Sequence, residues 1–319
     1  MYLSLSFIGS RKSDILELWS RVLCNAPTDI ARSILEFAAQ LDKTTACSIA
    51  LVSKEANAWV TPILYQTVIL TDAHIEMVEA KLPSFEHTKT LILSTSSVPE
   101  PSLLKVSYPA LRQLHIHDGI AWEISQKYLI SALPDQLHEL VVNSPLQSAF
   151  AFMPIYSALT HLAFVHDIPR SFPEIPPQAF PHLTHFACPY FVTNGRSFLP
   201  VYETSAMLVV ELAYTLDKVL QIPSLRVAVV LVKDFSEVTT SSETAMTDNE
   251  RQARMYALLR EVPQKDAEKV VLIARRGTTF YDDKSKPEEA WDTSATSSTS
   301  YWHKAEVVRE SRRVTGQVV

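Results

Sequence analysis

Apolar and polar residues recur along this chain with two different periods, and the first is helical. Four apolar residues near the N-terminus are spaced by four, three and four positions: Ile30, Ile34, Phe37 and Leu41. That spacing places their side chains on one side of an α-helix. Pro27 and Asp29 stand where such a helix would begin, because a proline loses no hydrogen bond there and the helix dipole favours a carboxylate.

A second helix is predicted to follow directly. Asp42 and Thr44 are candidate N-caps, since their side-chain oxygens can accept hydrogen bonds from the first backbone N–H groups. Its apolar positions are Ala46, Ile49, Ala50, Val52, Ala56, Trp59 and Val60. We expect Pro62 to end this helix, because proline disfavours helical geometry at the residue before it. Two helices this short need a partner surface for stability, either the rest of the chain or another protein.

A longer pattern recurs from residue 88 onward. Each copy holds an apolar residue, two variable residues, an apolar residue, one variable residue and a third apolar residue. The clearest copies are Leu111, Leu114 and Ile116; Leu137, Leu140 and Val142; Leu159, Leu162 and Phe164; and Leu183, Phe186 and Cys188. Weaker copies are Thr88, Leu91 and Leu93; Met207, Val210 and Leu212; and Leu225, Ala228 and Val230.

The spacing of these copies is typical of leucine-rich repeats, which have periods of about 20–29 residues. Successive copies begin at residues 88, 111, 137, 159, 183, 207 and 225. We expect each copy to supply one short strand of a parallel sheet, with the stacked repeats forming a continuous core. The alternative is an ordinary α/β domain with alternating strands and helices. Prolines between the copies favour short connections, and so favour the solenoid over long crossover helices.

Alternation along each predicted strand leaves a second set of side chains on the opposite face. This set includes His115, His117, Val141, Asn143 and Val165. Much of the strip is apolar, and contiguous exposed apolar area tends to mark interaction sites. We therefore predict that these residues bind a target protein. Two alternatives remain open: the C-terminal segment covers this strip, or the register is shifted by one residue.

The segment 26–60 resembles an F-box, the helical module that docks on the Skp1 subunit of cullin-type ubiquitin ligases. Members begin with Leu-Pro, carry Ile or Leu through the first helix, continue with Leu-Val-Ser or Leu-Val-Cys, and end on Trp. The matching residues here are Pro27, Ile30, Ile34, Leu35, Leu51, Val52, Ser53 and Trp59. Ala26 departs from the usual leucine. The longer stretch 34–70 resembles F-box-like proteins that are abundant in mushroom-forming fungi.

This resemblance and the repeat pattern together predict the organisation of the chain. The predicted class is α/β, with a short helical F-box-like unit at 1–65 followed by an irregular leucine-rich-repeat-like solenoid with a parallel sheet at 66–275. Polar residues 236–250 are predicted to be a mobile loop. The remainder, 276–319, is predicted to be partly disordered, with a terminal helix from Tyr301. The alternative for the first unit is a plain helical hairpin that caps the solenoid.

Composition narrows the classes of partner. The 319 residues are 47% apolar, enough for a continuous core, and the formal net charge of −6 argues against nucleic acid as the main partner. No run approaches the roughly 18 apolar residues of a membrane helix, and the first residues are a poor secretory signal. Cys24, Cys47 and Cys188 lie far apart, as expected of thiols in a reducing compartment. We therefore expect a cytoplasmic or nuclear protein that does not bind membranes.

Motifs that carry chemistry are missing from the sequence. There is no phosphate-binding glycine loop, no G-x-S-x-G elbow, no H-E-x-x-H pair and no cysteine pair with zinc spacing. The nearest metal pattern is His115, His117 and Asp118, which we interpret as exposed side chains because Leu114 and Ile116 take the core face. No cofactor is expected.

The sequence predicts a non-catalytic adaptor, the substrate-recognition subunit of a Skp1-cullin-F-box ubiquitin ligase. The resemblance implies that Pro27, Ile30, Ile34, Leu35, Leu51, Val52 and Trp59 contact Skp1. One alternative is a repeat scaffold for protein–protein interaction without a ligase, and another is an enzyme with an unrecognised site on the repeat face.

Overall fold

A computed structural model describes nine stretches of the chain: 26–71, 83–94, 108–116, 136–142, 154–164, 176–192, 205–234, 268–275 and 301–315. The chain divides into two compact units. The described residues of the first unit are 26–67 and 84–88, and the second unit holds the others. The predicted mobile loop at 236–250 lies outside the described residues, as does most of the segment 276–319 apart from its helix.

The segment 26–67 of the first unit contains three α-helices where two were predicted: α2 (Thr28–Leu41), α3 (Lys43–Ala50) and α4 (Lys54–Leu64). Asp42 caps α3 as expected, with the Thr45 backbone N–H donating to its Oδ1 at 2.8 Å. Ser53 caps α4 in the same way, since the Ala56 N–H donates to its Oγ at 3.0 Å. This second cap begins a new helix, which is why the predicted second helix is broken in two.

The expectation that Pro62 ends a helix is wrong, because Pro62 lies inside α4 and the helix continues to Leu64. Because proline has no backbone N–H, Pro62 removes one hydrogen bond of the helix. This bond lies close to the end of α4, where its loss costs little stability. The three helices share a core of small residues that lets them pack closely: Ala39, Ala46, Ile49, Ala56 and Val60. Leu35, Ala38, Ala50, Ile63 and Leu64 pack around this core.

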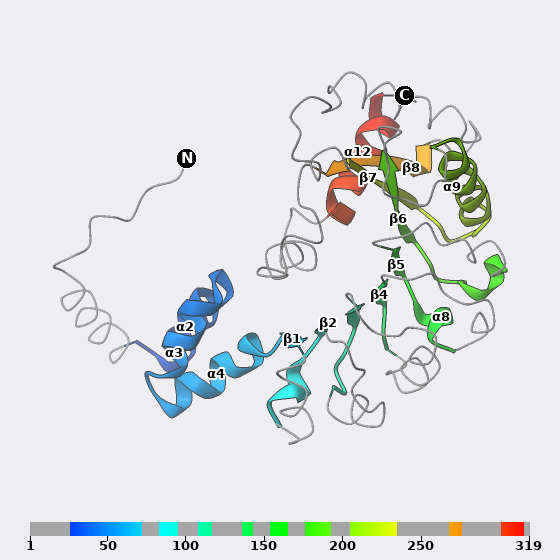
Figure 1. Cartoon of the computed structure of the whole chain (residues 1–319). Helices are drawn as coiled ribbons and strands as arrows, with labels where there is room; N and C mark the ends of the chain where they lie inside the picture. The colour runs from blue at the N-terminus through cyan, green and yellow to red at the C-terminus, as the bar shows by residue number, and fades with distance from the viewer. Residues whose placement is uncertain are drawn as a thin grey trace, which may run out of the picture. The chain divides into compact units, whose positions relative to one another are not determined.

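The second unit is built on an eight-stranded sheet whose strands follow one another in chain order (Figure 1). The strands are β1 (Thr67–Thr71), β2 (Thr90–Ser94), β3 (Gln113–Ile116), β4 (Glu139–Val142), β5 (His161–Phe164), β6 (His185–Val192), β7 (Val227–Asp234) and β8 (Val270–Arg275). Every neighbouring pair from β2 to β8 is parallel. The shorter described helical segments are η2 (Pro83–His87), α8 (Pro154–Ala158) and η5 (Pro177–Ala179). The mixed α/β class with a parallel sheet is confirmed.

Six of the seven predicted copies supply the strands β2 to β7. The middle apolar residues of these copies stand side by side in the sheet and are fully buried: Leu91, Leu114, Leu140, Leu162, Phe186 and Ala228. The last strand, β8, follows the final predicted copy and pairs in parallel with β7. Large apolar side chains therefore form the core on this face of the sheet, as the period predicts.

The copy predicted at Met207, Val210 and Leu212 is wrong, because these residues lie in the helix α9 (Ser205–Leu220). Its buried apolar residues have helical spacing: Leu212, Leu216, Val219 and Leu220. No proline interrupts this run. The connection from β6 to β7 is therefore a long crossover helix, against the expectation that such helices are lacking.

Candidate functional site

The first unit carries apolar side chains that its own core does not use. Ile30, Phe37 and Leu41 lie on one stripe of α2, and Phe37 and Leu41 are 65% and 69% exposed. Ala31, Leu35 and Ala38 follow the same spacing one residue later and face the core of the unit. The helix α2 is thus apolar on two adjacent sides, and only one of them is covered by its own unit.

The turn between α3 and α4 exposes two further apolar residues. Leu51 is 88% exposed and Val52 is 71% exposed. Their backbone N–H groups donate to the carbonyls of Ser48 and Ile49, at 3.3 and 3.0 Å. The backbone of the turn is therefore fixed while its side chains extend into solvent.

The remaining residues predicted to bind Skp1 occupy different environments. Pro27 is exposed immediately before α2. Ile34 and Trp59 are half-buried, and Leu35 packs on the core of the unit. Phe37 and Leu41 were not among the predicted site residues, although their spacing with Ile30 already marked one apolar stripe.

The expectation that His115 and Val141 are exposed is wrong. His115 is fully buried and Val141 is 1% exposed. Val141 belongs to an apolar cluster with Ala163 and Ala187, to which Trp302 and Ala305 of the helix α12 (Tyr301–Thr315) also belong. The C-terminal segment thus covers this face, as one of the two open alternatives stated. His117, Asn143 and Val165 lie outside the described residues.

A row of polar side chains crosses the same face of the sheet, two residues before the apolar cluster. Five of its members stand in register on neighbouring strands: Thr90, Gln113, Glu139, His161 and His185. The Thr90 hydroxyl donates to Gln113 Oε1 at 2.6 Å, and Gln113 Nε2 donates to Glu139 Oε2 at 2.8 Å. Each member directly precedes the middle apolar residue of a repeat copy, a sequence signal that identifies the whole row.

Glu139 is a buried carboxylate with partners on two sides. The indole N–H of Trp302 donates to its Oε1 at 3.2 Å, and His115 Nε2 lies 3.7 Å from the same oxygen. Burial acts to raise the pKa of Glu139, but its contacts with His115 and then with its other neighbours outweigh burial, and the pKa lies below its ordinary value. Glu139 is therefore ionised at neutral pH and is held by its hydrogen bonds.

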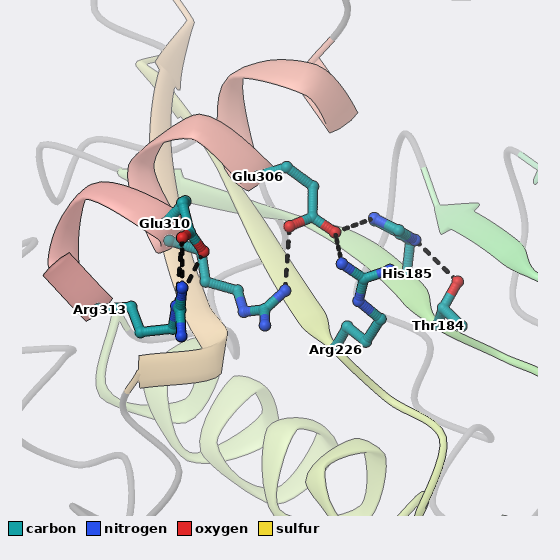
Figure 2. A network of polar contacts seen from close by, with 7 residues as sticks. Thr184, His185, Arg226, Glu306, Glu310 and Arg313 are labelled. Atoms are coloured by element: carbon teal, nitrogen blue, oxygen red, sulfur yellow. Dashed lines mark hydrogen bonds and ion pairs between the residues drawn. The ribbon is translucent and has the colours of Figure 1, made fainter.

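The two histidines of the row are stacked, and both contact α12. The rings of His161 and His185 lie 4.2 Å apart, and each meets the Trp302 ring edge-on. His185 Nδ1 lies 2.8 Å from the Thr184 hydroxyl. Its Nε2 lies 3.1 Å from Glu306 Oε1, an oxygen that also pairs with Arg226 at 3.2 Å (Figure 2). Arg309 binds the other Glu306 oxygen at 3.0 Å.

The environment of His185 favours its neutral form. Burial lowers its pKa from 6.5 to about 4, and the charges of His161 and Arg226 act in the same direction. Glu306 opposes them but does not restore the ordinary value. Burial also lowers the pKa of His161. Two adjacent imidazolium ions would repel each other, so the stacked pair packs best when both rings are neutral.

Lowering the pH from 7 to 5 is expected to cost the second unit about 2 kcal/mol of stability through His185. The pKa of His185 is about 4 when folded and near 6.5 when unfolded, so the unfolded chain binds the proton more readily between these values. The stabilisation is present above pH 6.5 and is lost as the pH falls toward 4. Urea unfolding at each pH measures it. The variant His185→Gln keeps a donor for Glu306 without titrating, and an equal pH dependence in this variant would contradict the assignment.

Among the described residues, no group of three His, Cys, Asp or Glu side chains is placed to hold a metal ion. Glu139, His161 and His185 of the polar row contact α12, whereas the apolar stripe of α2 and the turn after α3 expose apolar side chains to solvent. No helix in the described part of the chain has the length and apolar character needed to cross a membrane.

No known protein-family model matches the chain, and no curated protein matches it in sequence.

Proposed function

We propose that this chain is a non-catalytic adaptor whose first unit docks on a Skp1-like protein of a cullin-type ubiquitin ligase. The observation that carries the proposal is the exposure of Ile30, Leu51 and Val52, three residues that the F-box resemblance assigns to Skp1 contact. Exposed apolar side chains gathered on a small helical unit favour a protein partner, because burying them removes apolar surface from water.

The docking surface of the proposal consists of the α2 stripe and the turn after α3. Phe37 and Leu41 extend the stripe beyond Ile30 and supply large apolar area. Binding energy at such surfaces is concentrated in a few buried anchors, with the surrounding contacts excluding water. Leu51 and Phe37 are the proposed anchors, since both are large and largely exposed.

The second unit of the proposed adaptor is an irregular leucine-rich-repeat-like solenoid that holds the target protein. Its support is the strand order and the register, in which equivalent residues of successive repeat copies stand side by side from β2 to β6. The crossover helix α9 makes the array irregular at β7. In the alternative, a repeat scaffold without a ligase, the three helices are a structural cap and a Skp1-like protein does not bind.

A pull-down with a purified Skp1-like protein tests the proposal. Phe37→Asp and Leu51→Asp should each weaken binding at least about 100-fold, because each places a carboxylate at an apolar anchor. Gln40→Asp introduces the same charge on α2 off the apolar stripe and should bind nearly as well as the unaltered chain. Equal binding by all four folded proteins would contradict the proposed surface, and binding by none would favour the scaffold.

A further inference from the structure

The helix α12 rests on a face of the sheet that is shaped for a helix. Three adjacent strands, β4, β5 and β6, place small side chains on the covered face (Val141, Ala163 and Ala187), with larger residues such as Ile92 and Leu231 to either side, whereas the opposite face of the same three strands carries Leu140, Leu162 and Phe186. Small side chains let a helix backbone approach a sheet closely. Ala305 of α12 is fully buried against this strip, as such close approach requires.

The polar groups at the edge of the strip match groups on one side of α12. Glu139 accepts from the Trp302 indole at 3.2 Å, while His185 and Arg226 meet Glu306 at 3.1 and 3.2 Å (Figure 2). Trp302, Ala305 and Glu306 stand at positions i, i+3 and i+4 of α12, so their side chains share one side of the helix. The sheet thus presents an acceptor in Glu139, an apolar strip, and two nitrogen groups, of His185 and Arg226, in the order in which one helix uses them.

The anchoring of α12 is unlike that of a permanent core helix. Among its described residues, Trp302, which is 7% exposed, and Ala305, which is fully buried, are the only buried apolar ones, while Val307, Val308 and Val314 are exposed. A buried carboxylate such as Glu139 is costly, and apolar residues of similar size often hold an interface at least as firmly. Polar pairs instead add specificity for one partner pattern, because a mismatched partner leaves them unsatisfied.

The connection to β8 gives α12 room to leave the sheet. Residues 276–300 separate the end of β8 from the start of α12. A segment of this length has a maximum reach of about 80 Å when extended. The helix itself is only about 22 Å long at 1.5 Å per residue. Departure of α12 therefore does not require β8 to move.

We infer that the sheet face beneath α12 is a helix-binding groove that α12 occupies in place of an external partner. The partner is an amphipathic helix with a tryptophan, a small residue three positions later and a glutamate next to it. Recognition comes from the indole N–H on Glu139, the small residue on the Ala163 and Ala187 strip, and the carboxylate on His185 and Arg226. This inference goes beyond adaptor docking and holds whether or not the first unit binds a Skp1-like protein.

The test uses a fluorescent peptide of residues 301–315 as the probe, added to the full chain. In the chain, Ala305→Arg should expel α12 by placing a large charged side chain in the strip. Anisotropy should then show the peptide binding at least tenfold more tightly to this variant than to the unaltered chain, because an occupied groove lowers apparent affinity. Glu306→Ala, at the partly exposed edge, should give a smaller increase of a few fold. A control peptide with alanine at positions 302 and 306 should not bind.

Three outcomes would overturn the inference. Equal binding of both peptides, or of neither, by the folded variants would show that the face does not select this pattern. Loss of cooperative unfolding in both Ala305→Arg and Glu306→Ala would show that α12 is an inseparable part of the core. A concentration-dependent dimer of the unaltered chain that the peptide dissociates would identify the occupant as α12 of a second copy, not a helix from another protein.

Discussion

Replacing Val141 by glutamate is expected to destabilise the second unit by at least about 4 kcal/mol, enough to unfold most marginally stable domains. Val141 is 1% exposed, between the strip residue Ala163 and the buried His115 on the neighbouring strands. A carboxylate there has no room to reach water and lies near the existing charge of Glu139. Burying an unpaired charge is among the largest single-residue effects on stability.

Urea unfolding followed by circular dichroism measures this effect, and the chain offers a matched control. Val307 on α12 is exposed, so Val307→Glu makes the same chemical change in solvent and should alter stability by less than about 1 kcal/mol. If Val141→Glu were as stable as Val307→Glu, the helix α12 would not cover this face in solution.

Truncating Glu139 to alanine is expected to cost about 3–5 kcal/mol, the range measured when one partner of a buried charged network is removed. The change leaves two donors, Nε2 of the half-buried Gln113 and Nε1 of the buried Trp302, without their acceptor. Glu139→Gln keeps a carbonyl oxygen of the same shape, and so should lose less than half as much. Thermal unfolding of the three proteins provides the comparison. Equal midpoints for Glu139→Ala and the unaltered chain would show that the polar row does not secure the sheet.

The sheet was largely predictable from sequence because its signal is local and repeated. Leu114, Leu140 and Leu162 recur with their flanking apolar residues at nearly constant spacing, and each pair of copies therefore predicts adjacent strands. The residues on the opposite face of the sheet were also assigned to the correct side, as Val141 shows. The repeat period predicts where the strands lie, and the alternation of side chains along a strand predicts which face each residue takes.

The sequence did not decide whether the C-terminal segment covers the sheet face opposite the leucine core, because this covering depends on contacts between distant segments. Trp302 and Glu139 are separated by 163 positions, and no local pattern links them. The error at α9 has a different cause. A run such as Met207 to Leu212 contains so many apolar residues that it fits both a strand and a helical spacing, and the length of the whole segment decides between them.

The exposed apolar residues of the first unit were predicted in part. Ile30, Leu51 and Val52 followed from the F-box resemblance, whereas for Phe37 and Leu41 the sequence left open whether the rest of the chain or another protein covers them. A stripe on a helix shows which residues share a side, but not which of two apolar sides its own unit covers. On α2 the alanines take the inner side, because their small size allows closer helix packing.

Because α12 covers the sheet face that was predicted to bind a target, the proposed adaptor needs another way to bind one. A target cannot reach Val141 or His115 while α12 is in place. Either the target displaces α12, as the helix-binding groove implies, or it binds elsewhere on the second unit. The exchange of the 301–315 peptide distinguishes these two modes without knowledge of the target.

The proposed docking of the first unit on a Skp1-like protein is measured by calorimetric titration of the full chain with that purified protein. We expect saturable binding with a Kd of about 1 μM or tighter and a negative heat-capacity change from apolar burial, both lost in Leu51→Asp. Absence of binding by a folded chain, or unchanged binding by Leu51→Asp, would contradict the proposed docking.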